Sequence, residues 1–356
     1  MNNYVPFLKL KVNEIGALKG LDAEIKKMIV PFFDFPQKVD ITEDQFIDMI
    51  AKSARKIKKN LSGYKAFYLD NFDISDKLKI AGKDNYEFVI DSFSDQKFIP
   101  VLGLDRALGR SQIIFAAKKD GRIISDTVAL RLLVEDFEDF DAVVGEISDL
   151  ADQAGDLFDN WVLIFDNRMC LNIDTEERSS LIAEFIQESE KVFSFDEIIV
   201  TGSSIPASIK DIVSSVSDIT HDRAELAIYR GVTDKLEQVS ITLGDYTIVS
   251  PLYSDLNVPP EALRNVTAPK IVYSYEDVHY IERGGSLKSH ARGSLQYNDI
   301  ALNLIGMHFY RGAPYSYGDN YIYQKANFIG TSITPSSILN PTINAHITYM
   351  CIDFIV

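Results

Sequence analysis

The stretch WVLIFDNRMCLNIDTEERSSLIAEFIQESEKVFSFDEIIVT, residues Trp161–Thr201, decides the fold class. It opens with a short apolar run, Trp161–Asp166, and closes with another, Glu197–Thr201. Between them, Thr175–Phe193 places apolar residues at spacings of three and four, which is typical of a helix with one buried face. A strand, a helix and a strand in this order predict two parallel strands joined by a helical crossover.

The same alternation extends over the first 250 residues. Helical patterns also occupy Glu43–Leu61, Asp141–Phe158 and the shorter Ala207–Val216. Eight strands alternating with helices predict a (β/α)8 TIM-barrel-like α/β domain over residues 1–250, because eight parallel strands close a barrel. An open, doubly wound sheet is the alternative, but no GxGxxG motif follows an early strand. The eight apolar runs, each typical of a strand buried on both faces, are Tyr4–Leu10, Ile29–Phe35, Ala66–Asp70, Phe98–Leu104, Val128–Val134, Trp161–Asp166, Glu197–Thr201 and Tyr246–Val249.

Residues 251–356 form a predicted C-terminal extension, mostly β, that is rich in tyrosine and histidine. Lys270–Tyr275 and Val278–Glu282 indicate a β-hairpin, Ser294–Gly306 a helix, and Ile347–Ile355 a final strand. A segment of this size has a marginal core of its own. We therefore expect it to pack across the carboxyl-terminal rim of the barrel.

Charge separates the two parts and excludes some functions. The net charge is −16, from 36 basic and 52 acidic residues, and residues 270–356 are neutral. An acidic protein repels phosphate backbones, so the chain is not expected to bind duplex nucleic acid by itself. It has no apolar stretch long enough for a membrane span and no signal-peptide pattern at the N-terminus. With Cys170 and Cys351 as the only cysteines, we expect a cytoplasmic protein with free thiols.

Five pieces of the chain stand out by their order and spacing: YVPFLKLKVNEIGAL at Tyr4–Leu18, IVPFFDFP at Ile29–Pro36, GSSIP at Gly202–Pro206, GDY at Gly244–Tyr246, and IERG at Ile281–Gly284 followed by SYGDNYI at Ser316–Ile322. Through these pieces the chain resembles the beta family proteins of bacteria and phages. The resemblance implies a barrel-like fold and an association with phages or antiviral defence, but no established reaction. The family ending usually carries Trp-Arg and later His-His, whereas this chain has PSSILNPTIN at Pro335–Asn344 and only His346.

Acidic residues end five of the predicted strands. Function in barrels lies at the carboxyl ends of the strands, so converging carboxylates there could bind Mg²⁺ or act as a general acid and base. The alternative is that each acid forms a turn or caps a helix. The five acids are Asp34, Asp70, Asp105, Asp136 and Asp166.

Basic and polar residues near the same ends are candidate ligand-binding groups. Lys9 on the first strand could neutralise the acids or form a structural ion pair, and Arg168 could bind a phosphate or carboxylate. Gly202-Ser203-Ser204 precedes a predicted helix whose first amides could bind an anion. From the extension, Arg283 is expected to reach the strand-end acids. The candidate lid residues are Arg283, His290, Asp319 and His346.

Two functions remain open. The first is a binding component of a phage-conflict system that recognises a small ligand or a partner protein, encoded in the same operon or by a phage. The second is a hydrolase of phosphoester or glycosidic bonds that uses the strand-end carboxylates. The sequence contains no GxSxG, HExxH or P-loop motif, so serine-hydrolase, zinc-protease and nucleotide-hydrolase chemistry have no support.

Overall fold

A closed barrel of eight parallel strands forms the first part of the chain. The computed structural model describes residues 4–38, 40–106, 109–253 and 267–354. The strand order around the barrel is β1-β11-β9-β8-β7-β6-β3-β2, so the first and last barrel strands are neighbours. The predicted (β/α)8 fold is therefore confirmed. The strands are β1 (Tyr4–Lys9), β2 (Phe32–Asp34), β3 (Phe67–Asp70), β6 (Phe98–Leu102), β7 (Thr127–Leu133), β8 (Asn160–Met169), β9 (Glu197–Ser203) and β11 (Ile241–Asp245).

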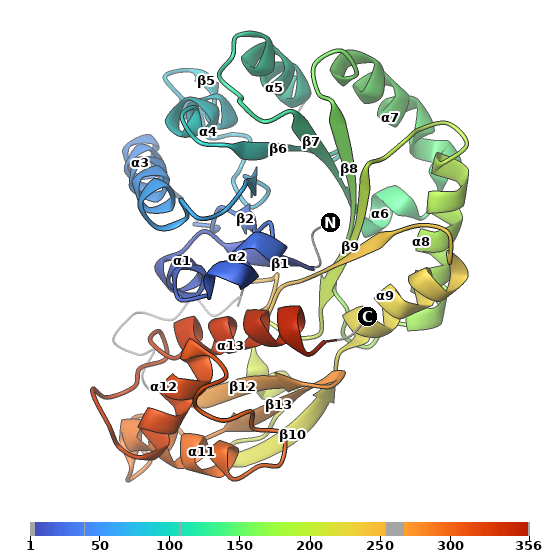
Figure 1. Ribbon diagram of the computed structural model, residues 1–356. Helices are drawn as coiled ribbons and strands as arrows, with labels where there is room; N and C mark the ends of the chain where they lie inside the picture. Colours follow the sequence, from blue (N-terminus) through green and yellow to red (C-terminus); the bar gives the residue numbers. More distant parts are fainter. Residues whose placement is uncertain (1–3, 39, 107–108, 254–266, 355–356) are drawn as a thin grey trace. The chain divides into compact units, whose positions relative to one another are not determined.

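Helices follow one another around the outside of the barrel (Figure 1). Two short strands, β4 (Lys79–Ile80) and β5 (Lys83–Asp84), form a separate small hairpin. No helix of the described residues is both long and apolar enough to cross a bilayer. The helices are α2 (Ala23–Met28), α3 (Glu43–Asn60), α4 (Asn85–Phe93), α5 (Arg110–Lys119), α6 (Val134–Phe137), α7 (Phe140–Ala154), α8 (Thr175–Ser189) and α9 (Ala224–Lys235).

Helix α3 shows how local sequence sets these elements. Thr42 accepts a hydrogen bond from the Gln45 backbone N–H, and the Gln45 side chain accepts one from the Thr42 N–H. This capping box satisfies two amides that the helix itself cannot pair. Phe46, Ile50 and Ile57 lie on one buried face. The predicted start of this helix, Glu43, is correct.

Aromatic and branched side chains fill the barrel interior below the strand ends. Phe7 of β1 stacks on Phe32 of β2, with ring centroids 4.3 Å apart, and Phe32 stacks on Tyr68 of β3 at 5.6 Å. Ile164 of β8 and Tyr246, directly after β11, are buried in the same cluster. The interior is therefore a packed core, and the buried acids Asp34, Asp70 and Asp166 lie above it at the strand ends.

A second compact unit consists of residues 12–25, 203–223 and 247–356, and the remaining residues make up the barrel unit. Its sheet has the order β10-β13-β12, with antiparallel pairs that include Tyr273 opposite Tyr280. The predicted hairpin and the helix near residue 300 are confirmed. The elements are α1 (Val12–Lys19), η1 (Ile209–Asp211), β10 (Ser217–Asp222), β12 (Lys270–Tyr275), β13 (Val278–Arg283), η2 (Gly293–Leu295), α11 (Gln296–Ile305), α12 (Tyr317–Ala326) and α13 (Leu339–Ile352).

Three predicted elements are wrong. The eighth barrel strand is Ile241–Asp245 rather than Tyr246–Val249. The prediction missed it because Gly244 interrupts its apolar run. The helix predicted over 207–216 is only the 3₁₀ turn η1. The final strand is instead helix α13, in which residues 341–350 are all buried, so no amphipathic period distinguishes helix from strand.

Within the second unit, α12 and α13 approach closely at a glycine. A Cβ atom on Gly318 would overlap the carbonyl oxygen of Pro341 and lie 2.8 Å from the Cβ of Ala345. The Gly318 N–H donates to Asn344 Oδ1 at 3.0 Å. Only a residue without a side chain permits this contact between the two helices.

Candidate functional site

Arg131 is the centre of a buried ionic network at the carboxyl ends of the barrel strands. Its side chain, 1% exposed, extends from β7 among carboxylates from three other strands. Nη1 donates to Asp34 Oδ1 and Asp70 Oδ2, both at 2.8 Å. Nε and Nη2 donate to Asp166 Oδ2 at 3.0 and 2.6 Å. Three of the five predicted strand-end acids therefore converge, around an arginine that the sequence interpretation overlooked.

A tyrosine hydroxyl completes this layer. Tyr246 donates to Asp166 Oδ2 at 2.6 Å and accepts a bond from Arg131 Nη2 at 2.9 Å. This hydroxyl holds Asp166 in place, since a buried carboxylate must be paired or hydrogen-bonded.

The network gives two of its acids opposite protonation tendencies. Burial favours the neutral form of Asp34, but the charges of Arg131 and Lys9 outweigh it and lower the Asp34 pKa below its ordinary value. For Asp70, burial dominates and raises the pKa, the Asp34 charge adds to this, and Arg106 and Arg131 offset only part of it. Asp70 is thus the easiest of the two to protonate.

A second layer of cations lies around the ring of Phe72. The guanidinium carbons of Arg106, Arg131 and Arg168 lie 5.0, 4.8 and 4.5 Å from the Phe72 ring centroid. Phe72 is the second residue after β3, and the faces of aromatic rings attract cations. The Phe72 ring therefore contacts Arg131 and also the two outer arginines, Arg106 and Arg168.

Asp73, the residue after Phe72, forms ion pairs with two cations of this layer, Lys9 and Arg168. Lys9 Nζ lies 2.8 Å from Asp73 Oδ2, and Arg168 Nη2 lies 3.8 Å from Asp73 Oδ1. Burial lowers the pKa of Lys9, although the charges of Asp34 and Asp73 oppose this shift. Arg106 donates to Asp70 Oδ2 at 2.6 Å. A loop carboxylate thus lies where strand-end cations from β1 and β8 meet.

The carboxylates do not fit the expected Mg²⁺ site. The guanidinium of Arg131 already lies among Asp34, Asp70 and Asp166, where a metal ion would need their oxygens. In the described ranges, no three or more His, Cys, Asp or Glu side chains are arranged to hold a metal ion.

Asp105 and Asp136 lie outside the network. Asp105 accepts from Arg106 Nη1 at 2.8 Å, and Asp136 accepts from the Leu133 N–H at the start of α6. Burial raises the pKa of Asp136. Asp136 therefore caps α6, as the structural alternative predicted, whereas Asp105 pairs with Arg106, which also binds Asp70.

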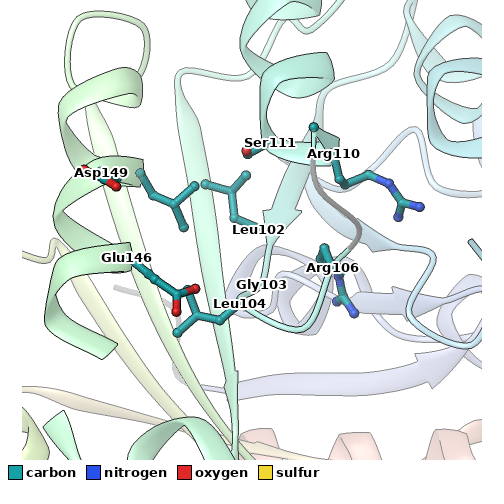
Figure 2. A pocket seen from close by; sticks show the side chains of 10 residues that line it. Leu102, Gly103, Leu104, Arg106, Arg110, Ser111, Glu146 and Asp149 are labelled. Carbon is teal, nitrogen blue, oxygen red and sulfur yellow. The ribbon is translucent and has the colours of Figure 1, made fainter. Parts of the chain in front are cut away.

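A surface hollow of about 240 Å³ adjoins Arg106, between the β6–α5 loop and α7. Figure 2 shows Arg106 and Arg110 extending away from Glu146 and Asp149, which lie across the hollow. Arg110 donates to Asn71 and Asp76 instead. The hollow therefore has no convergent set of charged groups.

The anion site expected at Gly202-Ser203-Ser204 lacks the helix on which it was based. Only the 3₁₀ turn η1 forms after it. A Cβ on Gly202 would lie 2.6 Å from Cys170 Sγ, so this glycine serves close packing. Ser203 Oγ donates to the Val249 carbonyl, and the Ser204 carbonyl oxygen lies 2.9 Å from His221 Nε2.

The four predicted lid residues all belong to the second unit. Arg283 donates to the Val213 carbonyl, and His290 Nδ1 accepts from the Arg292 N–H. Asp319 accepts from the Tyr273 hydroxyl at 2.6 Å, and burial raises its pKa. His346 Nδ1 lies 2.6 Å from Ser274 Oγ. Their approach to the barrel acids stays a prediction.

One sequence signal could have revealed the centre of the network. Arg131 interrupts an otherwise apolar strand, TVALRLL. A charge in a strand buried on both faces requires partners. Its partners Asp34 and Asp70 lie 97 and 61 residues away, which no local pattern shows. Phe72 and Asp73, on an irregular loop, gave no such signal.

Fold and site together define a (β/α)8-barrel protein whose strand ends meet in a buried arginine–carboxylate network. Residues 4–351 match the family described as Beta protein, and the chain belongs to that family. No curated protein and no solved structure matches the chain.

Proposed function

We propose that this protein is a binding component of a phage-conflict system, and that it recognises an anionic group at the carboxyl ends of the barrel strands. The group is a carboxylate or phosphate on a small ligand or on a partner protein. One observation carries the ligand chemistry: Lys9 and Arg168 bind the carboxylate of Asp73, a residue of an irregular loop. The phage-conflict context rests on family membership alone.

The inner layer supports binding rather than proton transfer. Asp34, Asp70 and Asp166 are fixed by Arg131, a cation that does not release its proton at neutral pH. These three carboxylates therefore form a rigid support that positions the outer cations Lys9 and Arg168. In this proposal, Asp73 is an internal competitor, and an incoming anion takes its place between Lys9 and Arg168.

Calorimetric titration with inorganic phosphate, and separately with acetate, tests the ligand chemistry. Asp73→Asn should strengthen anion binding about tenfold, or ~1.4 kcal/mol, because it removes the competing charge. Arg168→Met should weaken binding by a similar factor. Equal affinities in the natural protein and both variants would contradict the proposal, as would an absence of anion binding in Asp73→Asn.

Phage plating tests the biological context. Cells that express the natural protein should change the plaque count of at least one phage in a panel, relative to cells that carry Arg168→Met at equal protein level. Identical plaque counts across the panel for both strains would count against a phage-conflict role. The result of the anion titration would stay valid in that case.

A hydrolase is the second candidate, and the opposite pKa shifts of Asp34 and Asp70 favour it. Asp70 is buried, and its Oδ1 makes no hydrogen bond to any described residue. Chromogenic phosphodiesters and glycosides provide the assay. Turnover that Asp70→Asn abolishes, with the fold retained by circular dichroism, would establish this alternative; no turnover is expected from a binding protein.

A further inference from the structure

Helix α7 lies within a long stretch of a single charge sign. From Leu132 to Asn167 the chain has eleven acidic residues and no lysine or arginine. Six of the acids lie on α7 and in the loop after it: Asp141, Glu146, Asp149, Asp152, Asp156 and Asp159. Across the ranges that the structure describes, none of these six forms an ion pair. A nearby cation, Lys119, lines a neighbouring hollow together with Asp152 and Asp156 and pairs with neither of them.

An apolar hollow borders this helix. It has a volume of about 380 Å³ and lies between the second half of α7, the start of β8 and the segment between α8 and β9. Figure 1 shows α7 and α8 as neighbours on the outside of the barrel. Val192, which is 57% exposed, lies at its edge. The other lining side chains include Ile147, Asp152, Trp161, Phe193 and Phe195.

We propose that this hollow, the α7–α8 groove, binds a basic amphipathic segment of a partner polypeptide. The apolar residues of the segment would pack against Trp161, Phe193 and Val192. Its lysines or arginines would face Asp152, which lines the hollow, and Asp156, which follows the lining residue Gly155. Both acids are exposed and form no ion pair among the described residues. Grooves that combine an apolar floor with charges of one sign on the rim select partners by charge and bind through the floor.

Charge also determines which occupant fits. A second copy of this chain carries a net charge of −16, and repulsion opposes its approach to an acidic rim. A nucleic acid or an anionic membrane surface is repelled for the same reason. The groove lies at the amino ends of β8 and β9, whereas the anion site lies at the carboxyl ends of the barrel strands. The proposal is therefore independent of the proposed ligand.

Trp161 supplies a local signal, because it is the only tryptophan in the chain. The probe is a synthetic helical peptide of lysine and leucine with leucine along one face. Titration into the full-length protein should shift Trp161 emission to a saturating value, and added salt should weaken the affinity. Two control peptides, lysine–serine and glutamate–leucine of equal length, should bind at least tenfold more weakly.

Matched variants assign the binding to the groove. Asp152→Asn with Asp156→Asn should weaken peptide binding about fivefold or more. Asp44→Asn with Asp48→Asn, which makes the same charge change on α3, should change the affinity less than about twofold. Val192→Ser should also weaken it. Equal losses in the two double variants, an unchanged Trp161 emission, or binding as tight for the lysine–serine peptide would overturn the proposal. So would self-association of the protein through the groove.

Discussion

At the scale of single residues, Arg131 is the side chain on which the barrel's polar layer depends. Its guanidinium meets three buried carboxylates and a tyrosine hydroxyl. Taking these charges out of water is costly, and only their mutual attraction and full hydrogen bonding offset that cost. The network is consequently more sensitive to the loss of Arg131, the cation that all three acids share, than to the loss of any single acid.

Arg131→Met should lower the free energy of unfolding by about 3–5 kcal/mol, because it leaves three buried carboxylates without their shared cation. Urea unfolding followed by circular dichroism measures the change. Arg122→Met is the control, since Arg122 pairs with Asp91 at a partly exposed site and should change stability by less than about 1 kcal/mol. Similar losses in both variants would show that the network contributes no more than a surface pair.

Lys270 provides a pH test in the second unit. Burial, with a smaller contribution from the Arg283 charge opposite it on β13, lowers the pKa of Lys270 to about 8. The unfolded chain binds this proton up to a higher pH, so stability should rise as the pH increases from about 8 to 10.5.

Lys270→Met should accordingly stabilise the protein at pH 7 by about 1–3 kcal/mol. The gain should shrink as the pH rises through this range. Thermal unfolding at several pH values measures it, and Lys288→Met, at an exposed position on the same unit, serves as the control. A gain that does not depend on pH would show that the substitution acts through packing rather than through charge.

At the scale of elements, the sequence predicted those strands and helices whose burial leaves a recognisable pattern of apolar residues. Parallel strands covered on both faces must be apolar, and seven of the eight runs lie on barrel strands. Helix α3, which buries one face, was predicted at its observed start. Helix α13 could not be recognised in the same way, because a helix buried on every side has the composition of a strand and no period.

Helix contacts in the second unit depend on the small residue at their crossing. Gly318→Ala should lower the free energy of unfolding by about 1–3 kcal/mol, because the new methyl group would overlap Pro341 and Ala345 and force α12 and α13 apart. Urea unfolding measures it.

Gly145→Ala is the matched substitution, in the interior of α7. Apart from the adjoining residues and the backbone of α7 itself, no atom of the described residues lies within 4 Å of a Cβ placed there. It should stabilise the protein by about 0.5–1 kcal/mol, since alanine favours a helix interior. The explanation for Gly318 would be wrong if both alanine variants were stabilised.

At the scale of the whole molecule, the chain interleaves two compact units. The predicted boundary near residue 250 divides the chain into two continuous parts. Residues 12–25 and 203–223, however, belong to the same unit as the extension. The sheet shows why: β10 pairs with β13 across roughly 60 residues. A shift in composition along the sequence marks the boundary of a unit only where all residues of that unit are contiguous. The three converging acids were predictable from strand ends, but their arginine partner depends on the closed barrel.

Net charge predicts weak contact with nucleic acids. With a net charge of −16, the protein should show no submicromolar binding to random duplex DNA at physiological salt. Fluorescence anisotropy with a labelled duplex provides the measurement, and the same titration at low salt is the control for electrostatic attraction. Tight binding that weakens steeply with added salt would reveal a basic surface that the charge distribution hides.

The pairing of β1 with β11 has a consequence for synthesis on the ribosome. Tyr4 pairs with Leu243, so one side of the first strand waits for a partner that is translated about 240 residues later. At ~5–20 residues per second this interval lasts roughly 12–50 seconds. Throughout it, the nascent chain presents two open sheet edges, the kind of surface that other chains can join. Barrel closure is therefore a late event in translation, and a ribosome that stalls before residue 241 leaves a sheet that cannot close.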